Sequence, residues 1–173
     1  MSTRVAGVGM GRGAVVDGGA ARRVLKVLGR TGDDRVAVVL RATLALVIFP
    51  HGAQKVLGWF GGPGYGAAMA HLTGDYGLPW AVAFLVVLIE FLAPLALAVG
   101  LQSRVAAVGI AAVMVGAALT QHVSNGFFMN WFGTQAGEGF EYHLLAVGVA
   151  FAVMVRGSGS LSLDRRLFRG GQD

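Results

Sequence analysis

The chain contains no cysteine among its 173 residues. It therefore cannot carry out dithiol–disulfide exchange by itself, and any redox role requires a bound cofactor, a quinone or a partner subunit. The sequence also has no HExxH zinc signature, no HxxxH histidine pair, no nucleophile elbow and no phosphate-binding loop. We therefore expect no metal site, and the pattern argues against the common hydrolase and nucleotide-binding classes.

Charged residues are also scarce. They make up 13% of the chain, whereas hydrophobic residues make up 55% and the mean hydropathy is +0.65. The apolar residues form four runs, at 36–57, 80–101, 105–123 and 142–155. Three runs reach the roughly 20 residues that a transmembrane helix needs. The fourth is short, and it would span only with Phe140 and Glu141 inside the helix and with some tilt or local thinning of the bilayer.

These runs predict an all-α integral membrane protein, an antiparallel bundle of four transmembrane helices. A soluble bundle would need polar helix faces, which the runs lack. We expect a disordered, basic N-terminal segment at 1–35, a transmembrane domain at 36–157 and a tail at 158–173. Residues 20–28 place apolar and basic side chains on different helical faces, which fits either a short helix on the membrane surface or a plain basic flank.

The distribution of positive charge predicts the orientation. Seven of the 14 lysine and arginine residues precede the first run, one lies between the second and third runs, and four follow the fourth run. Four crossings place all these segments on one side, so the positive-inside rule puts both termini in the cytoplasm. Arg41 is expected to extend its guanidinium to the cytoplasmic headgroups. The net charge of +5 then reflects contact with anionic membrane lipid, and no nucleic-acid partner is expected.

Polar side chains concentrate in the outer half of the predicted bundle. His51, Gln54 and Lys55 end the first run, with His51 and Lys55 one turn apart on one helical face. Glu90 lies near the middle of the second run, where a carboxylate indicates a functional or network-forming role. Pro94 removes the helical hydrogen-bond partner of the Glu90 carbonyl. Two hydrogen-bond acceptors, the Glu90 carboxylate and its backbone carbonyl, therefore lie at a similar depth in the membrane. By depth, His51 is the nearest donor to Glu90, and Lys55 requires a longer reach.

The third and fourth runs add further polar groups on the same side. His122 ends the third run, and Glu141 and His143 begin the fourth. Charged groups are ordinary near a membrane interface, so we interpret His143 as interfacial and leave His122 open. The first outer loop is expected to hold a glycine turn and a short interfacial helix that ends near Gly74. An outer aromatic belt is predicted from Trp59, Phe60, Trp80, Phe127, Phe128 and Trp131.

Taken together, these motifs resemble the DoxX family of small bacterial membrane proteins. The resemblance covers about residues 36–164 and is carried by His51-Gly-x-Gln-Lys55, Gly58-Trp-Phe-Gly-Gly-Pro63, Gly77-Leu-Pro79, Glu90, Asn125-Gly-Phe-Phe128, Glu141-Tyr142 and Leu161-Ser-Leu-Asp164. It implies a four-helix protein of the bacterial inner membrane. It also implies a link to respiratory or oxidative-stress chemistry, through quinone-coupled thiosulfate oxidation or a membrane oxidoreductase complex.

The first functional hypothesis is a subunit of a quinone-linked oxidoreductase complex, with soluble or membrane redox proteins as partners. The candidate catalytic residues are Glu90, as a proton acceptor, and His51. The candidate ligand-binding residues are His51, Gln54, Lys55, Glu90, His122, Asn125 and Glu141, and quinone is the candidate cofactor. This hypothesis predicts an apolar cavity with His51, Glu90 and His122 on its wall and with Phe127 and Trp131 close to its mouth.

Two other functions stay open. The protein could be a non-catalytic membrane scaffold that recruits partner proteins, with the polar cluster serving only to fix helix packing. It could also transport a small solute, although four helices would then have to form a homo-oligomer to provide a pathway.

Overall fold

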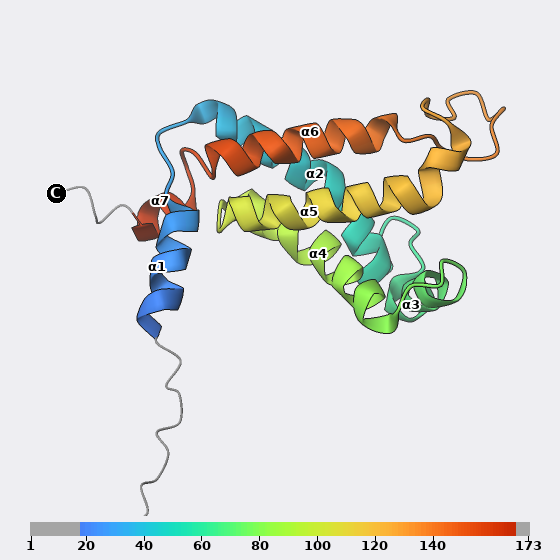
Figure 1. Ribbon diagram of the computed structural model, residues 1–173, viewed down its shortest axis with the longest axis horizontal. Coiled ribbons are helices and arrows are strands. Elements are labelled where there is room, and N and C mark those ends of the chain that lie inside the picture. Colours follow the sequence, from blue (N-terminus) through green and yellow to red (C-terminus); the bar gives the residue numbers. More distant parts are fainter. Residues whose placement is uncertain (1–17, 169–173) are drawn as a thin grey trace, which may run out of the picture.

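The computed structural model describes residues 18–168, and every regular element in that range is a helix (Figure 1). The elements are α1 (Gly18–Gly29), α2 (Arg35–Leu57), α3 (Gly64–Gly74), α4 (Trp80–Val99), α5 (Ser103–Ala117), the π-helix η1 (Ala118–His122), the 3-10 helix η2 (Val123–Asn125), α6 (Glu141–Arg156) and α7 (Leu163–Phe168). The prediction of an all-α protein is confirmed.

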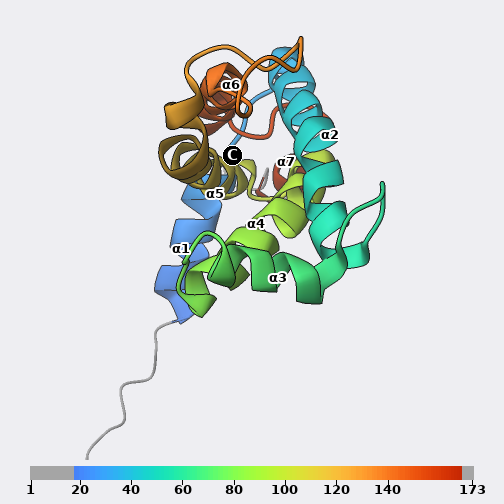
Figure 2. The same ribbon diagram turned by 90° about the vertical axis from the view of Figure 1, so that its right-hand side faces the viewer.

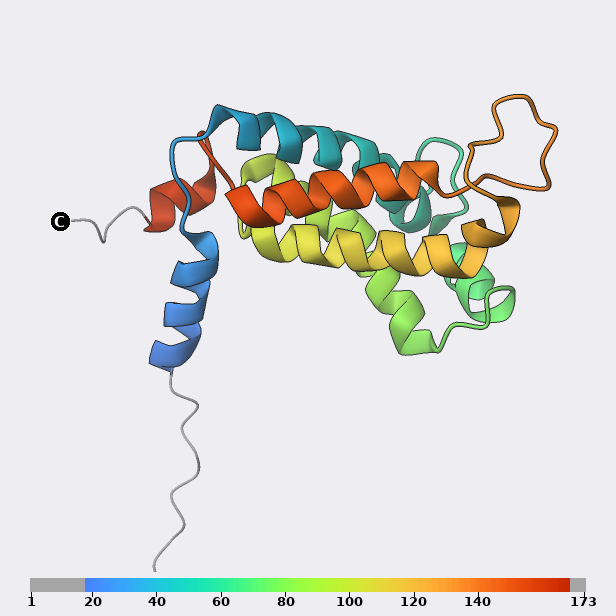
Figure 3. The same ribbon diagram turned by 45° about the horizontal axis from the view of Figure 1, so that its top comes forward.

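Four helices, α2, α4, α5 and α6, form the body of the molecule (Figures 1 and 3). α2 packs on α4 and α6, and α5 packs on the same two helices from the other side, so the four make a closed bundle. The buried core consists largely of small and branched apolar residues, among them Leu44, Ile48, Leu97, Ala107, Ile110 and Ala150. In a membrane, lipid is as apolar as the helices, so helices do not associate through the hydrophobic effect. Small residues let the helices approach closely and associate through van der Waals packing.

Three segments are long and apolar enough to cross a membrane, namely α2, α4 and the continuous stretch Ser103–Asn125. α6 has 16 residues, or about 24 Å of helix, against about 30 Å of hydrocarbon. Its packing between α2 and α5 suits a fourth span, but its length alone does not establish one. The count of four spans therefore stays a prediction.

The two ends of the bundle differ in what covers them. One end, here called the α3 end, carries α3, which lies across the bundle and packs on α4 through Met69, Leu72, Ala83 and Val87 (Figure 2). This short helix ends at Gly74, as predicted. The other end, here called the termini end, carries α1 and α7.

α1 runs crosswise to the bundle at the termini end (Figures 1 and 3). The last carbonyls of a helix have no helical partner. Here Gln102 donates to the Leu25 carbonyl, and Arg104 donates to the carbonyls of Leu28 and Arg30. Residues 20–28 are helical, as one of the two interpretations expected, and the position of this helix on a membrane surface stays a prediction. The division into a 1–35 segment, a transmembrane domain and a tail stays a prediction, and residues 1–17 lie outside the described residues.

α2 begins with a side-chain cap outside the membrane-spanning stretch. The Asp34 carboxylate accepts the Ala37 N–H at 3.1 Å and the Arg156 Nε–H at 2.7 Å. The backbone hydrogen bond from Ala37, and then the Arg156 guanidinium, lower the pKa of Asp34 below its usual 3.8. The cap thereby links the start of α2 to the end of α6.

Arg41 is buried at the termini end, where only 3% of the residue is exposed. Its guanidinium donates to the Leu97 and Ala98 carbonyls at 2.6 and 2.7 Å, which close α4. It also donates to three carbonyls of the α6–α7 loop, those of Ser158, Ser160 and Leu161. The prediction that Arg41 reaches the headgroups is therefore wrong. The terminal carbonyls of α4 and of the loop need donors, and the five N–H groups of an arginine supply them.

Candidate functional site

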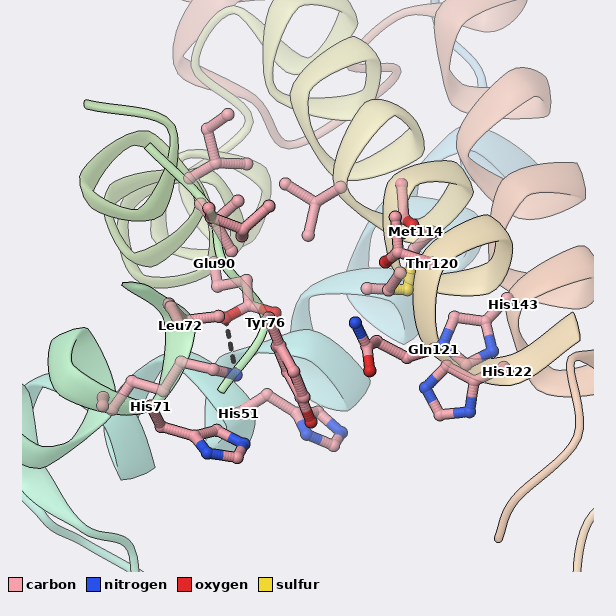
Figure 4. Close-up of a pocket in the computed structure, with 18 of the residues that line it drawn as sticks. His51, His71, Leu72, Tyr76, Glu90, Met114, Thr120, Gln121, His122 and His143 are labelled. Atoms are coloured by element: carbon pink, nitrogen blue, oxygen red, sulfur yellow. Dashed lines mark hydrogen bonds and ion pairs between the residues drawn. The ribbon is translucent and has the colours of Figure 1, made fainter. Parts of the chain in front are cut away.

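A cavity of about 980 Å³ lies at the α3 end of the bundle, among α2, α3, α4, α5, η1 and α6 (Figure 4). Most of its wall is apolar, with Leu72, Leu78, Val82, Val86, Ile89 and Met114 among the lining residues. Small residues make room for it on α3 and α5, namely Ala67, Ala68, Ala112, Gly116 and Ala117. The predicted apolar cavity therefore exists, and His51, Glu90 and His122 lie on its wall.

An ion pair occupies one side of the cavity. Glu90 Oε2 lies 2.7 Å from Lys55 Nζ, and the Glu90 side chain is 8% exposed (Figure 4). Glu90 Oε2 accepts no hydrogen bond from the described residues, so the contact with Lys55 is an ion pair. The expectation that His51 is the nearest donor to Glu90 is corrected, because Lys55 is the partner.

Contact between α2 and α4 explains this choice of partner. A Cβ atom on Gly52 would lie 2.2 Å from the Glu90 carbonyl oxygen, so the two backbones touch at this level. The helical N–H that would bond this carbonyl is missing because residue 94 is a proline. A helical side chain leans toward the start of its helix, so Lys55 reaches back along α2 to the level of Glu90.

His51 and Gln54 line the cavity on the same helix, α2. The His51 ring faces Tyr142 of α6, with 6.5 Å between ring centroids. Gln54 lies at the border of the site, where its Nε2 donates to the Phe60 carbonyl at 3.3 Å. His51 is therefore better placed than Gln54 to contact a molecule inside the cavity.

The π-helical segment η1 brings Thr120, Gln121 and His122 onto the wall. Single π turns are frequent at functional sites, because the extra residue redirects side chains. His122 Nδ1 lies 2.9 Å from the Glu138 carbonyl, so this nitrogen carries the proton. The His122 ring lies against the His143 ring of α6, with 4.1 Å between centroids.

His143 faces inward from the first turn of α6. It is 7% exposed and lines the cavity, so it points toward the interior of the bundle, and its interpretation as an interfacial residue stays a prediction. Its Nδ1 and the neighbouring Tyr142 Oη are buried and have no hydrogen-bond partner among residues 18–168. The sequence places both residues at the start of the fourth apolar run, but it does not show whether their side chains point into the bundle or toward the lipid.

α3 contributes polar residues that the sequence did not select. His71 lines the cavity, pairs with Asp75 one turn later, and lies 4.4 Å from Tyr76 between ring centroids. The available signal was the helical spacing of Ala67, Ala68 and His71, which predicts one common face. As a result, all four histidines of the chain, His51, His71, His122 and His143, line the same cavity.

Four residues expected at the site or its mouth do not line the cavity. Asn125 donates to the Gln121 and Glu138 carbonyls at 3.3 and 3.1 Å, and Glu141 accepts the Met129 N–H at 2.8 Å. Neither residue lines the cavity, and Phe127 and Trp131 do not line it either. The α5–α6 loop reaches the wall through Met129 and Glu138 instead. The binding roles of all the candidate residues stay predictions.

No group of three or more histidine, cysteine, aspartate or glutamate side chains is placed to hold a metal ion within the described part of the chain. The arrangement instead offers a large apolar space with separate polar groups on its wall. Such a cavity suits an organic molecule with a few hydrogen-bonding atoms.

Comparison with known proteins identifies the family. The DoxX family model matches residues 36–123, just over half of the chain. The chain is also 28% identical over 133 residues to a Bacillus subtilis (strain 168) protein named "Putative oxidoreductase CatD", an alignment that covers 77% of this chain and 87% of that protein. No solved structure gives a significant match. The chain is a membrane protein that belongs to the DoxX family.

Proposed function

We propose that this protein is a membrane subunit of a redox system and that it binds a quinone in the cavity at the α3 end. The observation that carries the proposal is the cavity itself, which combines apolar walls, a buried ion pair and four histidines. The name of the Bacillus subtilis relative, an oxidoreductase, points in the same direction.

The cavity fits a quinone by size and by chemistry. Its volume of about 980 Å³ lies at the upper end of the range usual for small-molecule sites, about 300 to 1,000 Å³. Apolar side chains from α4 and α5 suit the ring and the first part of an isoprenoid tail. When bound, a quinone supplies two-electron, two-proton redox chemistry, which a chain without cysteine cannot supply from its own side chains.

The residues of α2 and α4 would bind one polar end of the ring. Lys55 compensates the charge of the Glu90 carboxylate, and His51 lies on the same wall. Glu90 is the candidate proton acceptor, and His51 is the candidate group for passing that proton on, because a neutral imidazole can accept a proton at one ring nitrogen and donate one from the other. These three side chains are the core of the proposed site.

The proposal places the protein in the bacterial plasma membrane with both termini in the cytoplasm. The support is the charge distribution, because most of the 14 lysine and arginine residues lie before the first apolar run, between the second and third runs, or after the fourth run. In this orientation the cavity lies in the outer half of the membrane, next to the α2–α3 and α5–α6 loops.

A pair of glycine substitutions tests the binding site. Gly116 lines the cavity, and a Cβ atom added there would have no neighbour within 4 Å, so Gly116→Leu starts a side chain in ligand space without a clash at Cβ. Gly148 has the same free surroundings on α6 but does not line the cavity, so Gly148→Leu is the matched control. Both changes also raise helix propensity, which favours folding of both variants.

The measurement is the melting midpoint of detergent-purified protein with menadione, a quinone ring without a tail. At about 100 times its dissociation constant a ligand stabilises the folded state by about 2.7 kcal/mol. We expect a rise of several degrees for wild type and for Gly148→Leu, and little rise for Gly116→Leu or His51→Ala. If saturating menadione leaves the wild-type midpoint unchanged, the quinone site is rejected and the scaffold function replaces it. If menadione does raise the wild-type midpoint, mass spectrometry of the lipids and quinones that copurify with the protein identifies the natural ligand.

A further inference from the structure

Two polar atoms on the first turn of α6 set this part of the cavity apart. Tyr142 Oη and His143 Nδ1 are buried and have no hydrogen-bond partner among the described residues. Both residues line the cavity, and their rings lie 5.5 Å apart between centroids. Buried polar groups in native proteins are nearly always paired, so two adjacent exceptions at a cavity wall point to a missing partner.

Four other polar side chains of the wall already have partners. Lys55 pairs with Glu90, His71 with Asp75, and His122 with the Glu138 carbonyl. Gln54 donates to the Phe60 carbonyl. A ligand that binds these groups must compete with existing contacts, whereas a ligand that binds Tyr142 and His143 satisfies atoms that are otherwise unpaired.

We propose that Tyr142 and His143 bind one polar oxygen of the ligand, opposite the oxygen that faces Lys55 and Glu90. This inference rests on the proposed quinone site and adds the residues for its second end. Figure 4 shows Glu90 at the left of the cavity and His143 at the right. The ligand class is therefore a planar ring with an oxygen substituent at each of two opposite positions.

The chemistry of this pair suits both redox forms of such a ring. A phenol can donate or accept a hydrogen bond, and a neutral imidazole nitrogen does one or the other according to its tautomer. A carbonyl oxygen would accept from the Tyr142 hydroxyl, and a ring hydroxyl would donate to an unprotonated His143 Nδ1. The pair therefore recognises the oxygen position without depending on one oxidation state.

The first test compares two tyrosines of the same cavity. Tyr142→Phe removes the unpaired hydroxyl, and Tyr76→Phe is the matched control, because Tyr76 also lines the cavity but is 40% exposed. The loss of one hydrogen bond weakens binding by about two- to tenfold. We expect a weakening of that size for menadione with Tyr142→Phe and none with Tyr76→Phe. We expect 2-methylnaphthalene, which has the ring framework but no carbonyl, to bind both variants and wild type equally.

The melting midpoint without ligand gives an independent measurement. Removal of an unpaired buried hydroxyl should leave the midpoint of Tyr142→Phe equal to that of wild type or higher. For the second residue, His143→Asn keeps an amide atom close to the Nδ1 position and should retain more affinity than His143→Leu. This order is not expected of a residue that only fills space.

The outcomes separate this inference from the proposed function. If menadione binds wild type and the Tyr142 and His143 variants equally, while Gly116→Leu still weakens binding, the α6 assignment is wrong and the quinone site stands. If Tyr142→Phe melts several degrees lower without ligand, the hydroxyl has a partner inside the protein and the assignment is also wrong. If menadione does not bind wild type, both are rejected.

Discussion

The Lys55–Glu90 ion pair shows how a single glycine sets the chemistry of the site. The depth of a residue along its helix does not specify how two helices are rotated against each other. The sequence therefore predicted Glu90 in the polar cluster, but it did not predict which residue pairs with it. The close approach at Gly52 fixes that rotation, and it brings Lys55 rather than His51 to the carboxylate. The inward direction of Tyr142 and His143 was unpredictable for the same reason.

We predict a non-additive cost for breaking this pair. Glu90→Ala and Lys55→Ala each leave one charge without a partner, which costs about 3 kcal/mol or less here because Lys55 is 26% exposed. The double variant should cost less than the sum of the single variants. Glu90→Gln should cost less than Glu90→Ala because it keeps the shape of the side chain. Chemical unfolding in detergent measures these free energies, and strict additivity would show that the two charges do not interact.

A second prediction concerns Gly52 itself. A methyl group there would lie 2.2 Å from the Glu90 carbonyl oxygen and 2.5 Å from its carbon, so α2 and α4 must separate. Overpacking of this kind costs about 1 to 3 kcal/mol. Gly148→Ala is the control, since nothing lies within 4 Å of that position and alanine favours a helix. Equal unfolding free energies for the two variants would contradict the backbone contact described here.

At the scale of helices, hydropathy predicts the elements well and their ends less well. The first run, 36–57, corresponds to α2 at Arg35–Leu57, and the second, 80–101, to α4 at Trp80–Val99. The π-helical turn η1 was not predicted, because no residue type in Ala118–His122 specifies an extra residue per turn. The burial of Arg41 was missed because its partners are backbone carbonyls of α4 and of the α6–α7 loop, which no side-chain pattern reveals.

The network around Arg41 yields a third prediction. Lysine has one ammonium group and cannot reproduce the planar set of five donors. Arg41→Lys should therefore leave several carbonyls unpaired and lower the unfolding free energy by about 2 to 4 kcal/mol. Amide hydrogen exchange should rise in residues 157–162 of the α6–α7 loop. Arg35→Lys, an exposed arginine on the same helix, is the control and should change neither measurement.

At the scale of the whole molecule, the crosswise position of α1 suggests where the membrane surface would lie. α2, α5 and α6 run roughly along the long axis of the molecule and α4 slants across them, while α1 turns across the end of the bundle (Figure 3). Val24, Lys26 and Val27 of α1 are exposed. This is the arrangement expected of a helix that rests on a membrane surface. It agrees with the proposed orientation, in which basic segments meet anionic headgroups.

Reporter fusions test the number of spans and the orientation together. A reporter active only in the cytoplasm should work at both termini, because four crossings return the chain to its starting side. A reporter active only outside should work near Gly64 and near Gly137, in the two loops at the α3 end. Outside activity at the C-terminus would mean that α6 does not cross the membrane, so it would overturn the four-span prediction.

The convergence of every histidine on one cavity gives the protein a built-in spectroscopic label. Incorporation of isotope-labelled histidine would produce four imidazole signals, all from residues that line the cavity, with no histidine signal from the rest of the chain. The nuclear magnetic resonance spectrum of those rings would report occupancy and proton exchange in the native sequence, without a single substitution. A reagent that modifies imidazoles, such as diethyl pyrocarbonate, would report the accessibility of the cavity. Protection of the four histidines from this reagent in intact membranes would reveal a natural ligand bound there.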